Sequence, residues 1–491
     1  MTAAFAALFL GCLVAILFDW RRGVSLCLAV GFLQDPVRKL IPGQPVQIVV
    51  AVAIAFSVCL LGVYVRGDRL GVRRLFRTFT RLRPPVAAFV LIVLIQCAHT
   101  LVRAGNSVLA GLGLLAYMSP ALALLVGDRF CEHFEDLRGW LFMYLTGAAA
   151  VAVTVLLQFS GLEPLVFSSI GAEYVYGGPT GIVRMMSGLM RSSEIAAWHL
   201  GAGACLLIAL TAAVRTFRMR LVSLAGAATM LVAVVLTGRR KMLGEILLFI
   251  VLYVFLVSQY RRGGSRLAQA AMAVLFLGTI VAQLFAASGS VSQLTPYLGR
   301  GATVVSDSTE RLYSMTIEQF RWVVYQNGWL GSGAGTAAQG SQYFGGGEEI
   351  VGGGAEGGLA KVLAELGIPG ALILVWLAFA IARSILRISR FARRAPPSQA
   401  LLLYGLVAFL PANAVVILTA HHVIGDHFVL IVLGLVGLGA SACAQDTRGA
   451  RAVPVPEAAP ASLEALPWPE RIAMEQALAA RDPRHAPRME E

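Results

Sequence analysis

The chain has 491 residues, of which 57% are hydrophobic and only 14% are charged, and its mean hydropathy is +0.74. Repeated apolar runs approach the ~20 residues that a helix needs to cross a bilayer, so this composition excludes a soluble globular protein. The formal net charge is +13, but basic residues in membrane proteins report orientation before they report an acidic partner. Nucleic-acid binding is therefore not inferred.

The apolar runs predict an all-α polytopic membrane protein with about twelve or thirteen transmembrane helices. The candidate spans are 3–18, 23–34, 45–65, 84–102, 106–127, 139–160, 194–214, 219–237, 242–258, 267–287, 358–382, 400–418 and 424–443. The first span has no basic region before it and no cleavage site of small residues after it, so we expect it to be a retained helix. The seven cysteines include six inside apolar runs, and neither a disulfide framework nor a metal site is expected from them.

Three parts are expected along the chain. Residues 1–160 hold the N-terminal helices, and residues 161–443 hold a membrane core interrupted by a long loop over 288–357. The tail 444–491 is rich in Ala and Pro with mixed charges, a composition typical of disorder.

Arginines predict the orientation. The connector 66–83 holds seven arginines and 383–394 holds five, so both are expected on the cytoplasmic side. Alternation then places the loops 161–193, 238–241, 288–357 and 419–423 on the opposite side. The acidic connector 128–138 fits its cytoplasmic side poorly, and the orientation of the N-terminus is left unassigned.

The turn Thr237–Lys241 carries Arg239, Arg240 and Lys241 on the side that should be depleted of cations. Clustered guanidinium groups suit a phosphate or pyrophosphate, because arginine offers paired donors and keeps its charge. The alternative is a cluster that reaches toward lipid headgroups.

A second cationic element lies in the loop before the span 194–214. Arg184 and Arg191 are seven residues apart and would share a face if the segment were helical. Ser192 or Ser193 is expected to cap the following helix, with Glu194 in its favourable first turn. The alternative for both arginines is an ordinary solvated loop.

The loop 288–357 predicts an amphipathic helix over 310–325, followed by the glycine turn Gly328–Gly335. Such a turn lets backbone N–H groups approach an anion, although a glycine turn by itself is more often only a turn. Glu356 follows at the start of the next span, where a carboxylate could act as a general base or simply complement the helix dipole.

Two further groups of charges lie near that helix. Lys361 and Glu365 are spaced to pair on one helix face, and they are expected to support the structure. His421, His422, Asp426 and His427 form another cluster at the membrane edge, which is interpreted as interfacial rather than catalytic.

In their order, these pieces resemble the bacterial O-antigen ligase and O-antigen or exopolysaccharide polymerase superfamily of membrane glycosyltransferases. In that family an arginine-bearing loop precedes a membrane helix, a "TGSRG"-like turn joins two later helices, and a large periplasmic loop with a glycine turn ends in "HN…l.ElGl.G". The matching pieces are Arg184 to Ser193, Thr237 to Arg240, Arg311, Gly328 to Gly335 and Leu363 to Gly370. The resemblance covers about residues 180–385, and it rests on the succession of motifs rather than on any one of them.

The chain departs from the family at one important position. Nine residues before Glu365, where the family usually has a histidine, this chain has Glu356. Which of Arg239 and Arg240 matches the family arginine is also open. If the histidine is needed as the base, Glu356 must replace it or the chemistry has changed.

The resemblance implies a GT-C-like architecture and a reaction on the periplasmic face of the inner membrane. A polyprenyl-pyrophosphate-linked glycan would be the donor, held by Arg184, Arg191, Arg239, Arg240 and Arg311, with a glycan or lipid as acceptor and Glu356 as base. Neither a metal nor another cofactor is implied, and other polysaccharide-assembly proteins are possible partners. A polymerase is favoured slightly over a ligase.

Two alternatives come from other classes of protein. A transporter or lipid-glycan flippase usually shows repeated halves, broken helices or charges near the midplane, whereas the charges here gather on one side. A non-catalytic assembly component could use the same scaffold, and the glutamate at position 356 keeps that reading open.

Overall fold

The computed structural model describes most of the chain. The described residues are 2–67, 76, 79–130, 134–170, 175–178, 181–214, 216–260, 295–300, 310, 313–338, 341, 357–393, 395–420, 424–452 and 468–469. The chain divides into two compact units, Met1–Asp446 and Thr447–Glu491. The elements discussed below belong to the first unit, except that the last residues of the helix His427–Ala452 belong to the second.

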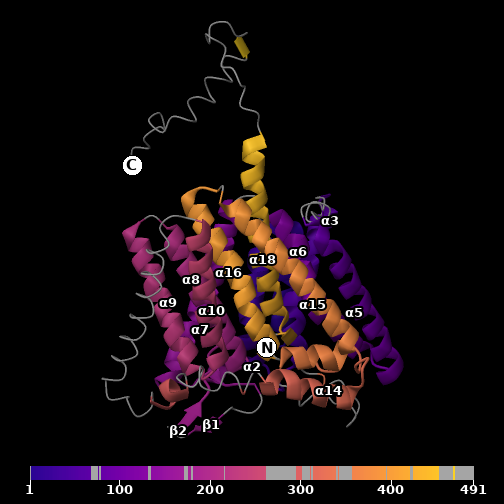
Figure 1. The fold of residues 1–491 in the computed structure, drawn as a ribbon. Coiled ribbons are helices and arrows are strands. Elements are labelled where there is room, and N and C mark those ends of the chain that lie inside the picture. The colour runs from indigo at the N-terminus through magenta and orange to yellow at the C-terminus, as the bar shows by residue number, and fades with distance from the viewer. Residues whose placement is uncertain are drawn as a thin grey trace. The chain divides into compact units, whose positions relative to one another are not determined.

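Helices make up nearly all of the described structure (Figure 1). The α-helices are α1 (Thr2–Phe18), α2 (Trp20–Leu40), α3 (Ala51–Val65), α5 (Arg83–Ala104), α6 (Ser107–Phe130), α7 (Phe134–Phe159), α8 (Ser193–Ala213), α9 (Phe217–Leu236), α10 (Arg240–Tyr260), α14 (Gln319–Asn327), α15 (Gly358–Ala392), α16 (Pro397–Thr419) and α18 (His427–Ala452). The 3-10 turns are η1 (Val46–Val50), η2 (Thr80–Leu82) and η3 (Leu165–Phe167), and a π-helical turn, η5 (Ser314–Glu318), precedes α14. The sheet in the described part is a hairpin in which β1 (Val175–Gly178) pairs antiparallel with β2 (Gly181–Arg184).

The prediction of an all-α polytopic membrane protein is confirmed. Within the described residues, eight helices are long and apolar enough to cross a membrane, and shorter apolar helices lie at 4–18, 107–123 and 427–437. Every expected span falls on a described helix except 267–287, which lies outside the described residues. The helix α18 continues to Ala452, past the expected start of the tail at residue 444.

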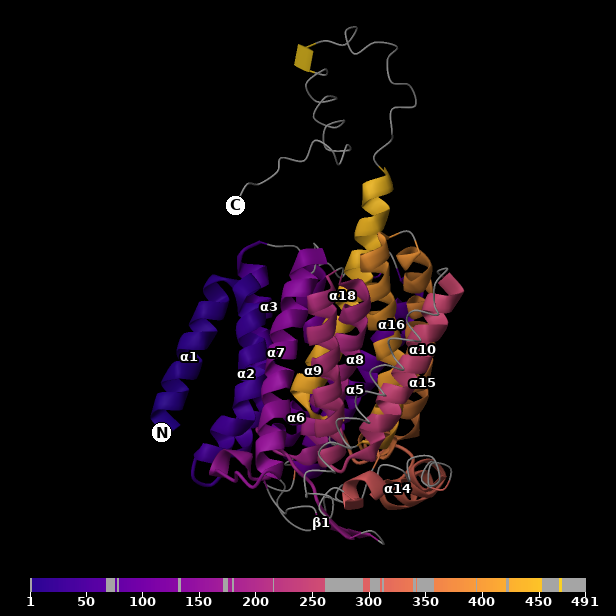
Figure 2. The same cartoon turned by 90° about the vertical axis from the view of Figure 1, so that its left-hand side faces the viewer.

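Successive membrane helices run in alternating directions, so their connections gather at two ends of the bundle (Figure 2). The loop end carries the β1–β2 hairpin, α14 and the turn at Gly238, and α1 also begins there. The arginine end carries the connectors rich in arginine. Asp136, from the acidic connector that fitted poorly, lies 3.9 Å from Arg21 at the arginine end. Asp136 therefore lies beside a cation, which accounts for its place on that side.

The centre of the bundle is α8, which is buried nearly all round. Small residues allow its neighbours to approach closely, as is common between membrane helices. A side-chain carbon at Gly203 would lie 2.5 Å from the sulfur of Met230 on α9. One at Gly405 on α16 would lie 2.3 Å from the Cβ of Ala209. The loop that precedes α8 therefore leads directly into a helix that is buried on nearly all sides.

Candidate functional site

The turn between α9 and α10 is the first part of the site. Gly238 adopts a left-handed conformation, with φ of +68°, and a side-chain carbon there would lie 3.2 Å from both Met185 and Val183. Arg239 donates from Nε to the hydroxyl of Ser193 at 2.9 Å. The turn therefore packs against the strand β2 and against the start of α8, as the sequence motifs require if they belong to one site.

The residues 295–300, which are helical, join the same cluster. Arg300 donates from Nε to the carbonyl of Gly238 at 2.9 Å, and the hydroxyl of Tyr297 donates to the carbonyl of Arg184 at 2.5 Å. Burial raises the pKa of Tyr297, although the nearby carbonyl and charge of Arg184 oppose the shift. Sequence analysis did not select Arg300, which adds a cation to this end of the bundle.

Arg184 lies at the end of β2 and its side chain is partly exposed. It forms an ion pair with Glu163, which follows α7. The segment between Arg184 and Arg191 is strand followed by turns rather than helix, so the two arginines do not share a helical face. The exposure of Arg184 leaves it at the surface of the loop end.

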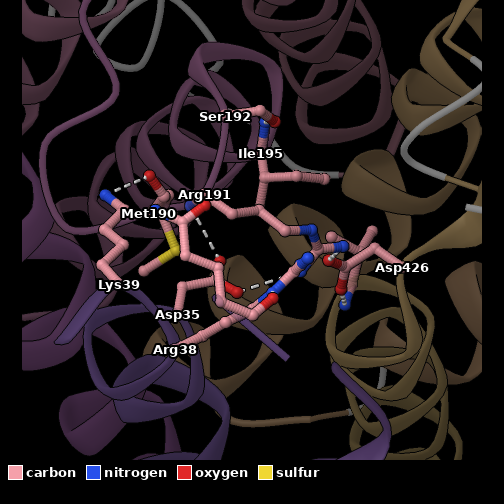
Figure 3. Close-up of polar contacts among 10 residues, drawn as sticks. Asp35, Arg38, Lys39, Met190, Arg191, Ser192, Ile195 and Asp426 are labelled. Atoms are coloured by element: carbon pink, nitrogen blue, oxygen red, sulfur yellow. Dashed lines mark hydrogen bonds and ion pairs between the residues drawn. The ribbon is translucent and has the colours of Figure 1, made fainter. Parts of the chain in front are cut away.

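Arg191 has a different environment, because it is buried between two carboxylates (Figure 3). Its Nη1 lies 3.2 Å from Asp35 Oδ1 on α2, and its Nη2 lies 2.5 Å from Asp426 Oδ2, just before α18. Its backbone N–H also donates to Asp35 Oδ2 at 3.0 Å. We call these three residues the Arg191 clamp. A phosphate could meet Nη1 or Nη2 of this guanidinium only by displacing a carboxylate.

Electrostatics hold the clamp in its charged state. Burial alone would lower the pKa of Arg191, but Asp426 and Asp35 outweigh it and raise the pKa above its ordinary value. Burial would raise the pKa of Asp426, but Arg191 and the backbone N–H of Val429 outweigh it and lower the pKa. A buried charge that is paired on both sides avoids the cost of an isolated ion.

Lys39 fixes the same loop from the end of α2. Its Nζ donates to the carbonyls of Val166, Gly188 and Met190 at 2.9, 2.8 and 2.7 Å. All three ammonium protons are thereby used, which satisfies the buried charge. Sequence analysis did not select Asp35 or Lys39. The signal was present, since charged residues directly follow the apolar run 23–34.

The start of α8 is capped as expected. The N–H of Ile195 donates to the Ser192 hydroxyl at 3.4 Å. Glu194 in the first turn lies 3.5 Å from Lys241, which also donates to the carbonyl of Thr419 at the end of α16. Through Lys241 the cationic turn is connected to α16 as well as to α8.

The expected pairing of Lys361 with Glu365 is confirmed. Both side chains are fully buried on α15, and Lys361 Nζ lies 2.6 Å from Glu365 Oε1. Glu365 also accepts from the Tyr117 hydroxyl on α6 at 2.6 Å and from the Ala337 N–H at 2.9 Å. Glu365 thus joins α6, α15 and the segment that follows the glycine turn.

The glycine turn is a packing element. The N–H groups of Ser332 and Ala334 donate to the carbonyls of Ala364 on α15 and Gln96 on α5, at 2.7 and 3.2 Å. At Gly335, where φ is +91°, a side-chain carbon would lie 1.9 Å from the carbonyl oxygen of Leu109. These two N–H groups bond to the protein itself, which favours the alternative that the segment is only a turn.

The helix expected over 310–325 takes the form of η5 followed by α14, and it ends at Asn327. Glu356, Arg311, His421 and His422 lie outside the described residues. His427 at the start of α18 is buried, with Nδ1 at 3.2 Å from the Ser119 hydroxyl. Among the described residues, no group of three or more His, Cys, Asp or Glu side chains could hold a metal ion.

Comparisons with known proteins add little. No protein-family model matches the chain, and no curated protein matches it. A chain from a solved structure described as "Structural coordination of polymerization and crosslinking by a peptidoglycan synthase complex" is similar with a TM-score of 0.35 and 15% identity, over 73% of this chain and 96% of that chain. Nothing about this chain is inferred from a similarity at that level.

Proposed function

We propose that this membrane protein is a glycosyltransferase similar to the O-antigen ligase and polysaccharide polymerase superfamily. It transfers or polymerises an oligosaccharide carried on a polyprenyl pyrophosphate, with polymerisation slightly favoured. The observation that carries the proposal is the convergence of cationic segments at the loop end. Strand β2, the turn at Gly238 and the residues 295–300 bring Arg184, Arg239 and Arg300 to one place, although they are distant in sequence.

The orientation of the bundle supports this proposal. Arginine-rich connectors mark the cytoplasmic side of a membrane protein, so the loop end faces the opposite side, which is the periplasm if the membrane is a bacterial inner membrane. Cations there suit a doubly charged pyrophosphate at the membrane surface. The donor's polyprenyl chain would remain in the bilayer while its head group meets the cationic turn.

The proposed reaction is a displacement at the anomeric carbon of the donor. The acceptor hydroxyl forms the new C–O bond, its proton passes to Glu356, and the bond to the pyrophosphate breaks. Arg184, Arg239, Arg240 and Arg311 stabilise the negative charge on the leaving polyprenyl pyrophosphate. Arg191 acts by fixing the loop between β2 and α8.

A transfer assay with a lipid-linked oligosaccharide tests the proposal in proteoliposomes. Replacing Arg239 and Arg240 together with alanine should lower transfer at least about 100-fold, since each such donor contributes about 10²–10³. Alanine at Arg218 and Arg220, at the opposite end of α9, removes the same charge and should preserve transfer. Full activity of the Arg239 and Arg240 variant would refute the cationic site.

The role of Glu356 needs a separate variant. Glu356→Gln removes the carboxylate while keeping nearly the same volume, so transfer should fall sharply if this residue takes the acceptor's proton. Normal transfer by Glu356→Gln would eliminate this residue as the base, without refuting the cationic site.

A transporter or flippase is the second candidate, and one observation favours it. Arg191, His199 and Glu245 are ionisable groups buried inside the bundle, and such residues often mark transport pathways. Movement of a lipid-linked oligosaccharide across protein-containing vesicles, without new glycosidic bonds, would support this candidate over the enzyme.

A further inference from the structure

A second polar region lies inside the membrane bundle, away from the cationic turn. Its central residue is Glu245 on α10, which is fully buried. Neither carboxyl oxygen has a hydrogen-bond partner among the described residues. Each turn of α10 rises by about 5.4 Å, so Glu245 lies more than one turn inside the bundle from Arg240.

Lys241 lies one turn earlier on α10, where it pairs with Glu194, and the groups that face Glu245 from other helices are uncharged. Gly201 of α8 lies beside the carboxyl group, since a side-chain carbon there would lie 3.4 Å from Oε2. The nearby polar or titratable groups are Asn413 of α16, Cys205 of α8 and Tyr144 of α7. The ionisable side chains of α9 are Arg218 and Arg220, at the opposite end of that helix. No described cation forms an ion pair with Glu245.

Asn413 is uncharged and cannot form an ion pair with a carboxylate, although one of its two amide N–H groups remains to interact with Glu245. Its Oδ1 accepts from the indole N–H of Trp198 at 2.7 Å, and its Nδ2 donates to the carbonyl of Phe409 at 3.0 Å. An isolated carboxylate in such surroundings costs several kcal/mol or more, and the group avoids that cost by taking up a proton.

Glu365 provides a contrast within the same protein. It is equally buried, but it has an ammonium group at 2.6 Å and two further donors. Those contacts stabilise its charged form. Glu245 has none of them, although both carboxylates lie inside the bundle.

A line of polar groups leads from Glu245 toward the Arg191 clamp. Tyr144 interacts electrostatically with Glu245, and its hydroxyl lies 3.1 Å from Nδ1 of His199. The other ring nitrogen of His199, Nε2, is buried without a hydrogen-bond partner. His199 in turn interacts electrostatically with Asp426 and Arg191 of the clamp. Buried polar groups are normally satisfied, and exceptions often mark function.

We propose that Glu245 is a proton-binding site inside the membrane bundle, with Tyr144 and His199 on the side from which its proton exchanges with the loop end. In this site the ligand is the proton itself. The carboxyl group binds it as a neutral acid. Among the described residues no hydrogen bond joins this carboxyl group to Tyr144, so transfer to the phenol requires one of the two side chains to move. The proposal is independent of the glycosyltransferase reaction, since it requires no saccharide.

Infrared difference spectroscopy of the full-length protein in lipid vesicles tests the site. A protonated carboxyl group absorbs as a carbonyl band distinct from that of a carboxylate. We expect this band in the unmodified protein near neutral pH, its loss in Glu245→Gln, and its retention in Glu365→Gln. No protonated-carboxyl band near neutral pH, or a band that persists in Glu245→Gln, would overturn the proposal.

A titration of the unmodified protein covers the case in which Glu245→Gln fails to fold. The band should weaken as the pH is raised, because the acid then loses its proton. A band that is absent near neutral pH, where exposed carboxyl groups are ionised, would refute the site without any variant.

Exchange into heavy water tests the route. The band should shift as the acid proton is replaced by deuterium, and Tyr144→Phe should slow that shift at least about 10-fold, since it removes the hydroxyl that contacts His199. A shift equally fast in Tyr144→Phe would refute the route through Tyr144. Retention of the unshifted band in the unmodified protein would refute proton exchange altogether.

Discussion

Removing the buried cation Lys361 should destabilise the bundle more than any exposed charge would. We consider Lys361→Met, which keeps an unbranched side chain of similar length. It leaves the carboxylate of Glu365 buried, with hydrogen bonds from Tyr117 at 2.6 Å and from the Ala337 N–H at 2.9 Å but without a cation. Loss of one partner from a buried ion pair costs about 3–5 kcal/mol. Because two hydrogen-bond donors to Glu365 remain, we expect Lys361→Met to lower the free energy of unfolding by about 3 kcal/mol, the lower end of this range.

The double variant Lys361→Met with Glu365→Gln isolates the charge effect. A neutral amide can still accept from Ala337, and no uncompensated charge remains in the core. The double variant should therefore be more stable than Lys361→Met alone, and a coupling energy of at least about 1 kcal/mol is expected for residues in contact.

Equilibrium unfolding of the protein in mixed micelles measures both the destabilisation by Lys361→Met and the coupling energy between Lys361 and Glu365. Arg22→Met is a suitable control, since Arg22 and its partner Asp19 are largely exposed and surface pairs contribute little. A Lys361→Met variant as stable as Arg22→Met, or a coupling energy near zero, would refute the assignment of Lys361 and Glu365 as a charged pair.

Two further predictions concern the glycine turn and the clamp. Gly335→Ala should clearly lower the thermal unfolding temperature, because the new carbon would lie 1.9 Å from the Leu109 carbonyl oxygen. Gly111→Ala on α6 is the control, since its new carbon would meet nothing within 4 Å. Equal unfolding temperatures of the two variants would contradict the packing role of Gly335. The clamp should weaken in acid: the pKa of Asp426 is lowered in the folded protein, so its contribution is present above the unfolded value of about 3.9 and is lost as the pH falls through the folded value. Between about pH 6 and about pH 3, the thermal unfolding temperature should fall less in Asp426→Asn than in the unmodified protein. An equal fall in both proteins would refute this role.

The membrane fold could be predicted from the sequence because apolar length is a strong local signal. The expected spans fall on helices wherever the structure describes them, and the cap at Ser192 followed from its place before α8. The pair Lys361 and Glu365 was also predictable, because both residues lie on one helix with a spacing that brings them together.

The partners of Arg191 could not be predicted in the same way. Asp35, Arg191 and Asp426 come from three segments that only tertiary packing brings together, and no local spacing relates them. The contacts of the glycine turn could not be predicted for a similar reason. Its N–H groups bond to Gln96 on α5 and Ala364 on α15, and neither contact can be deduced from the turn itself.

The cations of this protein fall into two groups with different physical roles. Lys39, Arg191 and Lys361 are buried, and each is held inside the bundle by carbonyl or carboxylate groups. Arg184 and Arg239 lie at the loop end with more access to solvent. Only the second group can exchange a protein contact for a phosphate oxygen at small cost, because the first would leave a buried carboxylate or carbonyl unsatisfied. Fewer arginines can therefore contact a pyrophosphate than the sequence motifs contain. The buried cations instead position the loop that carries the accessible arginines.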